Sequence, residues 1–193
     1  MTDRLLRIVL VRHGQPHIAL SLSTGHRGFH DYIGAYEAAG LDPSSLPPSE
    51  LTELRRELTT IYASDRPRAH QSARALGQGV EPLQDPLFAE APLASPPFPL
   101  LKLSMPWWAV ISRILWHLGF APGIETARQA GQRAEKAADT LIDRARETGI
   151  VALVAHGYFN FMIGRVLARR GFARRGSHRA RYWNTVIYER RDG

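Results

Sequence analysis

Two short apolar runs constrain the fold of this chain more than any other feature. Residues 5–11 and 150–155 are nearly continuous apolar segments, rich in β-branched and leucine side chains. Such segments are typical of strands buried on both faces of a sheet, as in parallel sheets that helices cover on either side. Each run leads into a histidine followed by a glycine, His13-Gly14 and His156-Gly157. The sequence therefore predicts an α/β fold with a histidine just beyond the end of each of two buried strands.

The rest of the chain alternates between helical and strand patterns. The spacing of apolar residues and the capping signals predict helices and further strands. The helices are expected over residues 31–40, 49–58, 65–77, 107–118, 126–147 and 158–170, and the strands over 59–63, 80–83 and 181–188. This alternation predicts a three-layer α/β/α sandwich with a mostly parallel central sheet. A length of 193 residues fits a single domain (1–193) with an irregular excursion, rich in proline and tryptophan, at about residues 85–120.

The amino-acid composition excludes several classes of functional site. The chain contains no cysteine, which excludes disulfides, thiolate zinc sites, iron-sulfur clusters and cysteine nucleophiles. Its net charge of +7 comes from the last 29 residues, because 165–193 contain nine arginines against Glu189 and Asp192. Residues 1–164 carry no net charge, so the overall charge does not predict a protein that binds polyanions over its whole surface. The lack of cysteine is compatible with a reducing cytoplasm, where we expect the protein to act.

No segment is typical of a membrane span or a signal peptide. The longest apolar stretch, residues 100–120, is interrupted by Lys102, Pro106, Arg113 and His117. We therefore expect no membrane among the partners. The tryptophans of this stretch, with Met105 and Phe98, could line a hydrophobic substrate pocket or dock on a membrane surface. The interpretation we favour is that they pack in the core and in a lid.

Histidines and arginines are predicted to meet at one edge of the sheet, because ligands of open α/β folds collect at the carboxyl ends of the strands. His13 and His156 follow two strands, and a third predicted strand ends at Ser64. The helix after Ser64 begins with Arg66 and Arg68, where first-turn amides and guanidinium groups both favour an anion. With Arg12, this pocket suits a phosphoryl group and could neutralise its oxygens without a metal.

Four motifs resemble the histidine phosphatase superfamily, the phosphoglycerate-mutase-like enzymes that carry an Arg-His-Gly motif. They are VRHGQP at 11–16, YASDRPRAHQSA at 62–73, FAEAPL at 88–93 and LVAHG at 153–157. The resemblance implies a phosphoglycerate-mutase-like fold. It also implies that His13 is the phosphorylated nucleophile, that Arg12, Arg68 and His156 hold the phosphate, and that Glu90 is the proton donor.

The chain departs from the family pattern just after the first motif. Many members carry Glu-Thr or Gln-Thr there and an asparagine a few residues on, whereas this chain has Gln15-Pro16 and Ala19. Gln15, His17 or Arg27 could supply the missing phosphate contact. Asn160 is a further candidate for substrate contact, or it orients His156 or caps the following helix. Glu81 and Asp85 remain alternatives to Glu90 as the proton donor.

The sequence thus predicts a metal-independent phosphatase that forms a phosphohistidine on His13 and needs no cofactor. Its substrate would be a small phosphomonoester or a phosphohistidine protein. A mutase is less favoured, because mutases of this family are generally longer. The alternative is an inactive module that binds a phosphorylated ligand in the same pocket, or nucleic acid through the Arg174–Arg181 loop with Tyr182 and Trp183. No nucleic-acid recognition motif accompanies that loop, so nucleic acid is not the expected partner.

Overall fold

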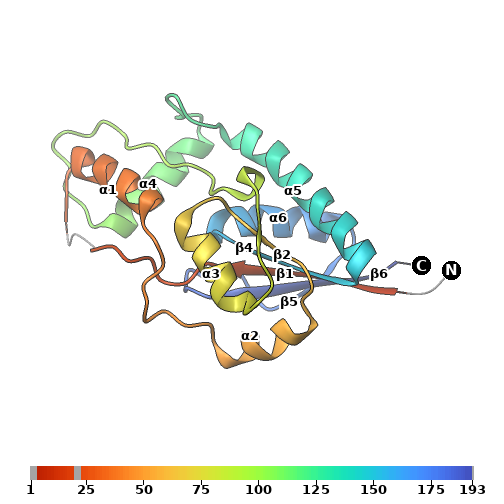
Figure 1. Cartoon of the computed structure of the whole chain (residues 1–193). Coiled ribbons are helices and arrows are strands. Elements are labelled where there is room, and N and C mark those ends of the chain that lie inside the picture. Colours follow the sequence, from red (N-terminus) through yellow and green to blue (C-terminus); the bar gives the residue numbers. More distant parts are fainter. Residues whose placement is uncertain (1–3, 20–22, 193) are drawn as a thin grey trace.

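A mixed, mostly parallel six-stranded sheet forms the centre of the molecule (Figure 1). The computed structural model describes residues 4–19 and 23–192. The strands follow the order β3-β2-β4-β1-β6-β5. In that order they span Leu83–Gln84, Ile61–Ala63, Ile150–Ala155, Arg4–Arg12, Thr185–Asp192 and Ala173–Arg175. Strands β1 to β4 pair in parallel, while β6 runs antiparallel to both of its neighbours.

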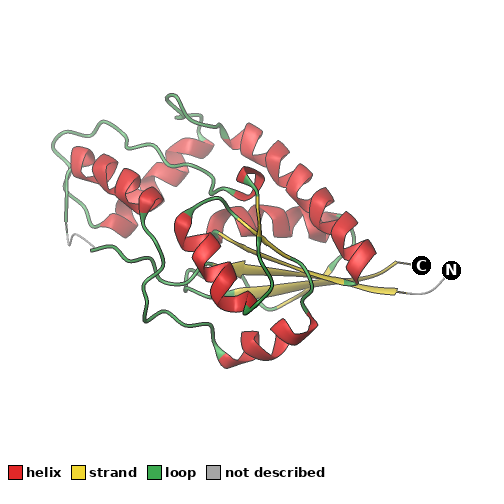
Figure 2. Cartoon of the chain, in the orientation of Figure 1, coloured by secondary structure: helices red, strands yellow, loops and turns green. Residues whose placement is uncertain are grey.

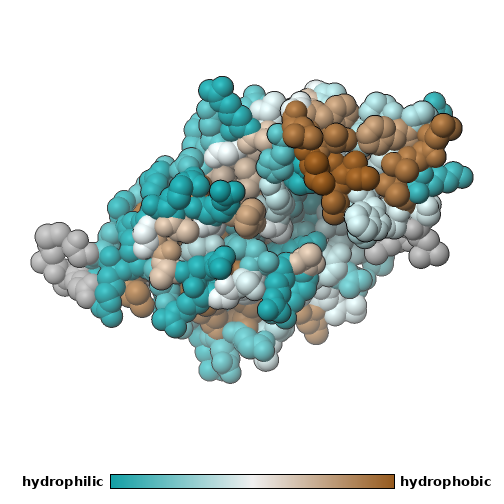
Figure 3. Space-filling model, turned by 180° about the vertical axis from the view of Figure 1, so that it is seen from behind, coloured by the Kyte–Doolittle hydropathy of each residue, from teal (hydrophilic) through white to brown (hydrophobic). Residues whose placement is uncertain are grey.

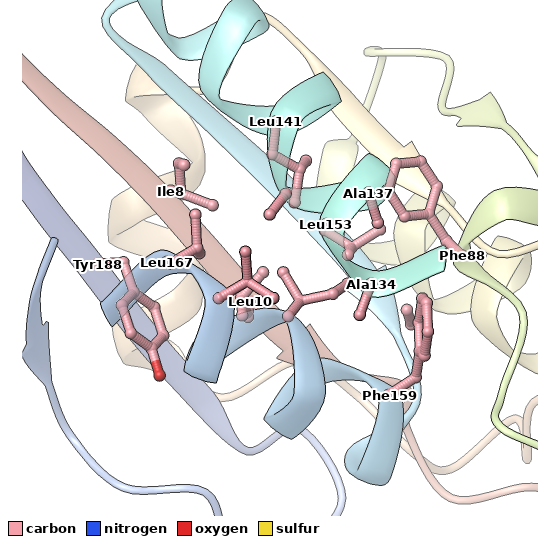
Figure 4. Packing of buried hydrophobic residues seen from close by; sticks show 14 of the residues in the cluster. Ile8, Leu10, Phe88, Ala134, Ala137, Leu141, Leu153, Phe159, Leu167 and Tyr188 are labelled. Atoms are coloured by element: carbon pink, nitrogen blue, oxygen red, sulfur yellow. The ribbon is translucent and has the colours of Figure 1, made fainter. Parts of the chain in front are cut away.

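Two long helices cover one face of the sheet, α5 (Ala127–Thr148) and α6 (Gly157–Arg169). Alternate residues of a strand point to opposite faces, so Ile8 and Leu10 of β1 point toward these helices. There they join Leu141 of α5 and Leu167 of α6 in one buried cluster (Figure 4). Thr126 and Gln129 form a reciprocal capping box at the start of α5, which satisfies backbone N–H groups that the helix leaves free.

Two shorter helices, α2 (Ser49–Leu54) and α3 (Pro67–Gly77), cover the opposite face. A 3-10 turn, η1 (Arg55–Glu57), extends α2. Val9 and Val11, which point away from α5 and α6, pack here with apolar residues of these helices. Strands β1 and β4 are therefore buried on both faces, which explains their continuous apolar sequences. The predicted three-layer α/β/α architecture is confirmed.

The remaining helices, α1 (His26–Ala38) and α4 (Met105–His117), pack on each other to one side of the sheet (Figure 1). Phe29 and Trp108 stack between them with ring centroids 5.6 Å apart. A short turn, η2 (Pro86–Phe88), and a long loop lead from the sheet to α4 (Figure 2). This loop and α4 correspond to the irregular excursion expected at about residues 85–120. Within the described residues, no helix is both long and apolar enough to cross a membrane.

Several predicted boundaries are wrong. The first helix begins at His26 rather than 31, and the third strand lies at Leu83–Gln84 rather than 80–83. Strand β5, Ala173–Arg175, was not predicted, because it is exposed and carries no apolar alternation. The last strand begins at Thr185 rather than 181. Trp183 has a φ of 57°, a left-handed conformation that ends the extended pattern before the strand starts.

Candidate active site

The register of β1 and β4 brings His13 and His156 together. Arg12 pairs with Ala155 across the parallel strands, so the next residue of each strand is a histidine. The ring centroids of the two histidines lie 5.2 Å apart, and both side chains are almost completely buried. The neighbouring strand β2 ends at Ser64, whose backbone N–H donates to the Val154 carbonyl at 3.2 Å. Three adjacent strand ends thus supply one cluster, as the alternation of strands and helices predicted.

The contacts of His13 define which ring nitrogen carries the proton and which carries the lone pair. Its Nδ1 lies 2.7 Å from the Gly14 carbonyl oxygen. Because a carbonyl oxygen only accepts, Nδ1 carries the proton and Nε2 carries the lone pair. Arg68 Nε donates to that Nε2 at 3.3 Å. The buried ring therefore presents a nucleophilic nitrogen beside a guanidinium group.

His156 is held by partners on both sides of its ring. Arg68 Nη2 donates to its Nδ1 at 3.3 Å, so the proton lies on Nε2, which donates to Ser64 Oγ at 2.9 Å. Burial is the main reason why the pKa values of both His13 and His156 lie well below 6.5, and the nearby arginines lower them further. Both rings are neutral at pH 7. The positive charge of the cluster comes from Arg68 and Arg12.

Arg68 connects the cluster to α1. It is the second residue of α3 and fully buried, and its Nη1 donates to the Tyr36 carbonyl at 2.6 Å and to the Glu37 carbonyl at 3.3 Å. The Tyr36 ring lies over its guanidinium, with the Cζ atom 4.3 Å from the ring centroid. The Tyr36 hydroxyl lies 3.5 Å from His13 Nε2. Helix α1 therefore covers the reactive nitrogen of His13 with a tyrosine.

Arg12 lies on the other side of the cluster, at the end of β1. Its Nη1 donates to the Ala180 carbonyl, and its Cζ lies 4.7 Å from the centroid of the Tyr182 ring. Its Nε is buried and has no hydrogen-bond partner within the part of the chain that the structure describes. A Cβ at Gly157 would lie only 3.3 Å from Arg12 Cδ. The glycine after His156 thus permits a close approach of this arginine.

Glu90 lies in the loop after η2, next to the start of α6. Its Oε1 accepts hydrogen bonds from the backbone N–H groups of Ala91 at 3.0 Å and Phe159 at 2.9 Å. Burial raises the pKa of the Glu90 carboxyl, and the charge of Arg113 opposes that rise. Phe159 lies three residues after His156, so its hydrogen bond fixes Glu90 beside the first turn of the helix that follows His156. A carboxyl group with a raised pKa has the property that a general acid needs near neutral pH.

Arg113 of α4 holds the backbone around Glu90. Its Nη1 and Nη2 donate to the carbonyls of Pro92 at 3.2 Å and Ala91 at 2.9 Å. Its Cζ lies 4.6 Å from the centroid of the Trp116 ring and 4.2 Å from that of Tyr158. The sequence alone did not indicate this role, because Arg113 lies in none of the motifs that resemble a known family.

Comparison with known proteins identifies the family. A model of the histidine phosphatase superfamily, branch 1, matches residues 49–191. The chain belongs to this superfamily. The matched region contains Arg68, Glu90 and His156, while Arg12 and His13 precede it. No curated protein matches the sequence.

Solved structures resemble this superfamily member over almost its whole length. A mycobacterial structure named mycobacterial hydrolase 1 has 18% identity and a TM-score of 0.63, with 98% of both chains covered. Mycobacterial glucosyl-3-phosphoglycerate phosphatase has 18% identity and a TM-score of 0.57, with 97% of both chains covered. Phosphoserine phosphatase from Entamoeba histolytica has 13% identity and a TM-score of 0.53, covering 97% of this chain and 95% of that one. These likenesses agree with the phosphoglycerate-mutase-like fold.

The other residues expected near the phosphate lie outside the cluster. Gln15 is exposed, and its backbone N–H donates to Ser45 Oγ. His17 is exposed as well and lies 3.4 Å from an Asp42 oxygen. Arg27 is exposed on α1 and lines a separate hollow of about 280 Å³. The hydrogen-bond partners of the His13 ring among the described residues are Gly14, Tyr36 and Arg68, and none of the three exposed side chains is one of them.

Asn160 is buried in α6 but neither orients His156 nor caps the helix. Its Nδ2 donates to the Val11 carbonyl at 3.0 Å, so it joins α6 to the end of β1. The two alternative acids also lie elsewhere. Glu81 is exposed and 3.7 Å from Arg74, and Asp85 accepts from the Leu87 N–H at the start of η2. Of the three carboxylates considered, Glu90 is the one with a hydrogen bond to the first turn of α6, the helix that follows His156.

Tyr36 and Tyr182 are the functional candidates that sequence reasoning missed or misplaced. Tyr36 has no sequence signal, because only the tertiary packing of α1 brings it to His13. The sequence placed Tyr182 on the last strand and, in the less favoured nucleic-acid alternative, made it a stacking platform; its ring lies under Arg12 and 6.0 Å from the His13 ring. Trp183, the second platform of that alternative, is buried and donates to Ser45 Oγ at 3.0 Å.

A metal site is not evident in the described part of the chain. Residues 4–19 and 23–192 contain no group of three or more histidine, aspartate or glutamate side chains placed to hold an ion. Arg66, the third guanidinium expected at the pocket, lies with its Nε 2.7 Å from a Glu37 oxygen. Arg66 pairs with that carboxylate, and its charge also lowers the pKa of His156, so it lies near the histidines together with Arg68 and Arg12.

Proposed function

We propose that this chain is a metal-independent phosphatase that hydrolyses a phosphomonoester through a phosphohistidine on His13. The observation that carries the proposal is the buried pair of neutral histidines bridged by Arg68. Arg68 Nε is directed at His13 Nε2 and its Nη2 at His156 Nδ1, so both ring nitrogens and the guanidinium face a common point. A phosphoryl group bound there would meet a nucleophile and a charge that stabilises its oxygens.

In the first step, the lone pair of His13 Nε2 attacks phosphorus and the bond from phosphorus to the leaving oxygen breaks. Glu90 donates its proton to that oxygen, so the alcohol leaves uncharged. The phosphorylated imidazole keeps its Nδ1 proton, and the Gly14 carbonyl, 2.7 Å away, stabilises the charge that develops on the ring. Arg12 and Arg68 would hold the phosphoryl oxygens through the step, and His156 would join them by turning its Nε2–H from Ser64 Oγ to a phosphoryl oxygen.

In the second step, water attacks phosphorus and transfers a proton to the Glu90 carboxylate. The phosphorus–nitrogen bond breaks, its electron pair returns to His13 Nε2, and inorganic phosphate leaves. The raised pKa of Glu90 suits both directions of proton transfer, because a carboxyl that holds its proton more tightly can donate it to the leaving oxygen and, once ionised, accept one from water. Arg68 Nε donates to His13 Nε2 at 3.3 Å and the Tyr36 hydroxyl lies 3.5 Å from the same atom. Substrate binding therefore requires Arg68 to redirect this hydrogen bond to the phosphoryl group and Tyr36 to move away.

The family membership and the phosphatases among the structural relatives support hydrolysis. We propose a small phosphomonoester as the substrate, with a phosphohistidine protein as a less favoured choice and phosphoryl transfer by a mutase less favoured still. We further propose that residues 1–193 act as one domain. An inactive module that binds a phosphorylated ligand through Arg12 and Arg68 is the alternative.

A phosphatase assay separates these functions. The purified protein is incubated with an aryl phosphate, with phosphoserine and with glucosyl-3-phosphoglycerate, each in the presence and absence of EDTA. We expect turnover that EDTA leaves unchanged, that His13→Ala abolishes, and that the exposed-histidine control His17→Ala retains. Acid-labile phosphate on the protein should disappear in His13→Ala. If phosphate binds but none of the esters is hydrolysed, the inactive binding module replaces the enzyme.

A further inference from the structure

We propose that the outer face of α4 docks on an anionic membrane surface. This proposal does not depend on the catalytic function. The starting observation is that α4 is apolar on two sides. Its inner side buries Met105, Trp108 and Trp116. Its outer side exposes Trp107, Val110, Ile114 and Leu118, spaced three and four residues apart along one helical face.

The exposed apolar area extends beyond the helix. Leu100 and Leu101, in the loop before α4, are exposed too, and Leu100 is 97% accessible. Figure 3 shows an apolar area gathered over this part of the molecule, bordered by hydrophilic residues. We call the six side chains of this surface the α4 apolar face: Leu100, Leu101, Trp107, Val110, Ile114 and Leu118. Contiguous exposed apolar patches on a folded protein mark interaction sites.

Aromatic contacts join this face to a basic part of the surface. His117 Nε2 lies 2.6 Å from the Tyr158 hydroxyl of α6, and the Tyr158 ring is 5.9 Å from that of Phe161. Phe161 in turn lies 5.8 Å from His178, in the arginine-rich loop before β6, and 6.0 Å from the guanidinium of Arg165. The apolar face and the basic loop therefore lie on one connected surface.

The charge of this surface indicates an anionic partner. The two segments that form it lie within residues 91–124 and 148–188, and neither stretch contains an aspartate or a glutamate. Lys102 and Arg165 are exposed on it. An apolar face flanked by the cations Lys102 and Arg165, in two segments that contribute no carboxylate, complements the headgroups and acyl chains of an anionic lipid leaflet. The exposed indole of Trp107 suits the boundary between headgroups and acyl chains.

The same charge argues against a second copy of the chain as the occupant. In a twofold dimer, each face would lie against its own equivalent. Lys102 and Arg165 of one copy would then approach those of the other, with no carboxylate from either face to pair with them. Docking on a membrane departs from the sequence-based expectation of no membrane partner, which rested on the lack of a spanning segment.

Vesicle binding tests the proposal, and Trp107 provides the signal. Trp107 is 63% exposed, whereas Trp108, Trp116 and Trp183 are buried. Addition of vesicles of phosphatidylcholine mixed with phosphatidylglycerol should shift the tryptophan emission to shorter wavelength and sediment the protein. Pure phosphatidylcholine vesicles should do so much less. In Trp107→Phe the emission shift should vanish while sedimentation persists.

Paired substitutions on the face give the decisive comparison. Ile114→Ser combined with Leu118→Ser should weaken vesicle binding at least about tenfold, because binding scales with the apolar area that enters the interface. The matched control Leu46→Ser removes a leucine of similar exposure elsewhere, 73% against 78% for Leu118, and should bind like the wild type. Lys102→Glu should weaken binding and reduce its dependence on salt.

Three results would overturn the proposal. The first is no binding to anionic vesicles at low salt, and the second is binding that the two serine substitutions leave unchanged. The third is a dimer in light scattering that the Ile114→Ser and Leu118→Ser variant converts to a monomer, which would make the face an interface between copies. Because neither vesicle binding nor light scattering requires turnover, failure here leaves the proposed phosphatase activity untouched.

Discussion

Replacement of Glu90 by glutamine tests the proton-transfer step of the proposed mechanism. Glutamine has nearly the same shape, and its amide oxygen keeps the hydrogen bonds from the Ala91 and Phe159 N–H groups at 3.0 and 2.9 Å. It removes only the proton that Glu90 would donate. The neutral amide resembles the protonated carboxyl that burial favours, so the free energy of unfolding should change by less than about 1.5 kcal/mol.

The size of the catalytic loss depends on the leaving group. General acid catalysis contributes a factor of about 10² to 10⁴, equivalent to about 2.7 to 5.4 kcal/mol of activation free energy. An alkyl phosphate needs all of this help, because its alkoxide is a poor leaving group. A nitrophenyl phosphate releases a stabilised anion, so its kcat should fall less than about tenfold.

The assay compares kcat for both esters in the wild type, in Glu90→Gln and in the exposed control Glu81→Gln. We expect a loss of about 10² to 10⁴ for the alkyl ester only, with phosphate affinity retained, and a control that behaves like the wild type. The wild type should also lose activity on the alkyl ester as the pH rises through the raised pKa of Glu90, a decline absent from Glu90→Gln. Equal losses for both esters, or none, would refute the assignment of the acid.

Three further predictions concern the surroundings of the cluster. Arg113 lowers the pKa of Glu90, so Arg113→Gln should move the alkaline limb of the pH profile with an alkyl ester upward; a downward shift would contradict this. A Cβ at Gly14 would lie 2.6 to 2.8 Å from three side chains, so Gly14→Ala should destabilise the protein by about 1–3 kcal/mol in urea unfolding, whereas Gly131→Ala, which meets nothing within 4 Å, should not. Since His13 and His156 have lowered pKa values, the unfolded chain binds more protons below pH 6.5, and stability should fall with decreasing pH by up to about 1.4 kcal/mol per unit for each histidine. In His156→Gln the slope of the unfolding free energy against pH should be smaller by the contribution of one histidine, up to about 1.4 kcal/mol per pH unit. An unchanged slope would show that this ring is not buried in its neutral form.

Local sequence patterns were sufficient for the centre of the fold. The continuous apolar runs of β1 and β4 specify strands that helices cover on both faces, and the histidine after each strand follows from the same pattern. The positions of Arg12, Arg68 and Glu90 near the histidine cluster follow from the resemblance of their motifs to a known family. The strands depend on periodicity over a few residues, which the sequence contains directly, whereas the roles of the arginines and the glutamate come from the motif resemblance.

The tertiary structure alone decided what surrounds the cluster. Tyr36, Tyr182 and Arg113 reach the site from α1, from the segment before β6 and from α4, and no local pattern states which long-range contacts those segments make. The tertiary structure also decided which tryptophans of α4 are buried and which is exposed. The sequence shows an apolar helix, but only packing against Phe29 buries Trp108 and leaves Trp107 in solvent. A helix that is apolar on two sides buries the side its neighbours cover, and which side that is depends on the whole fold.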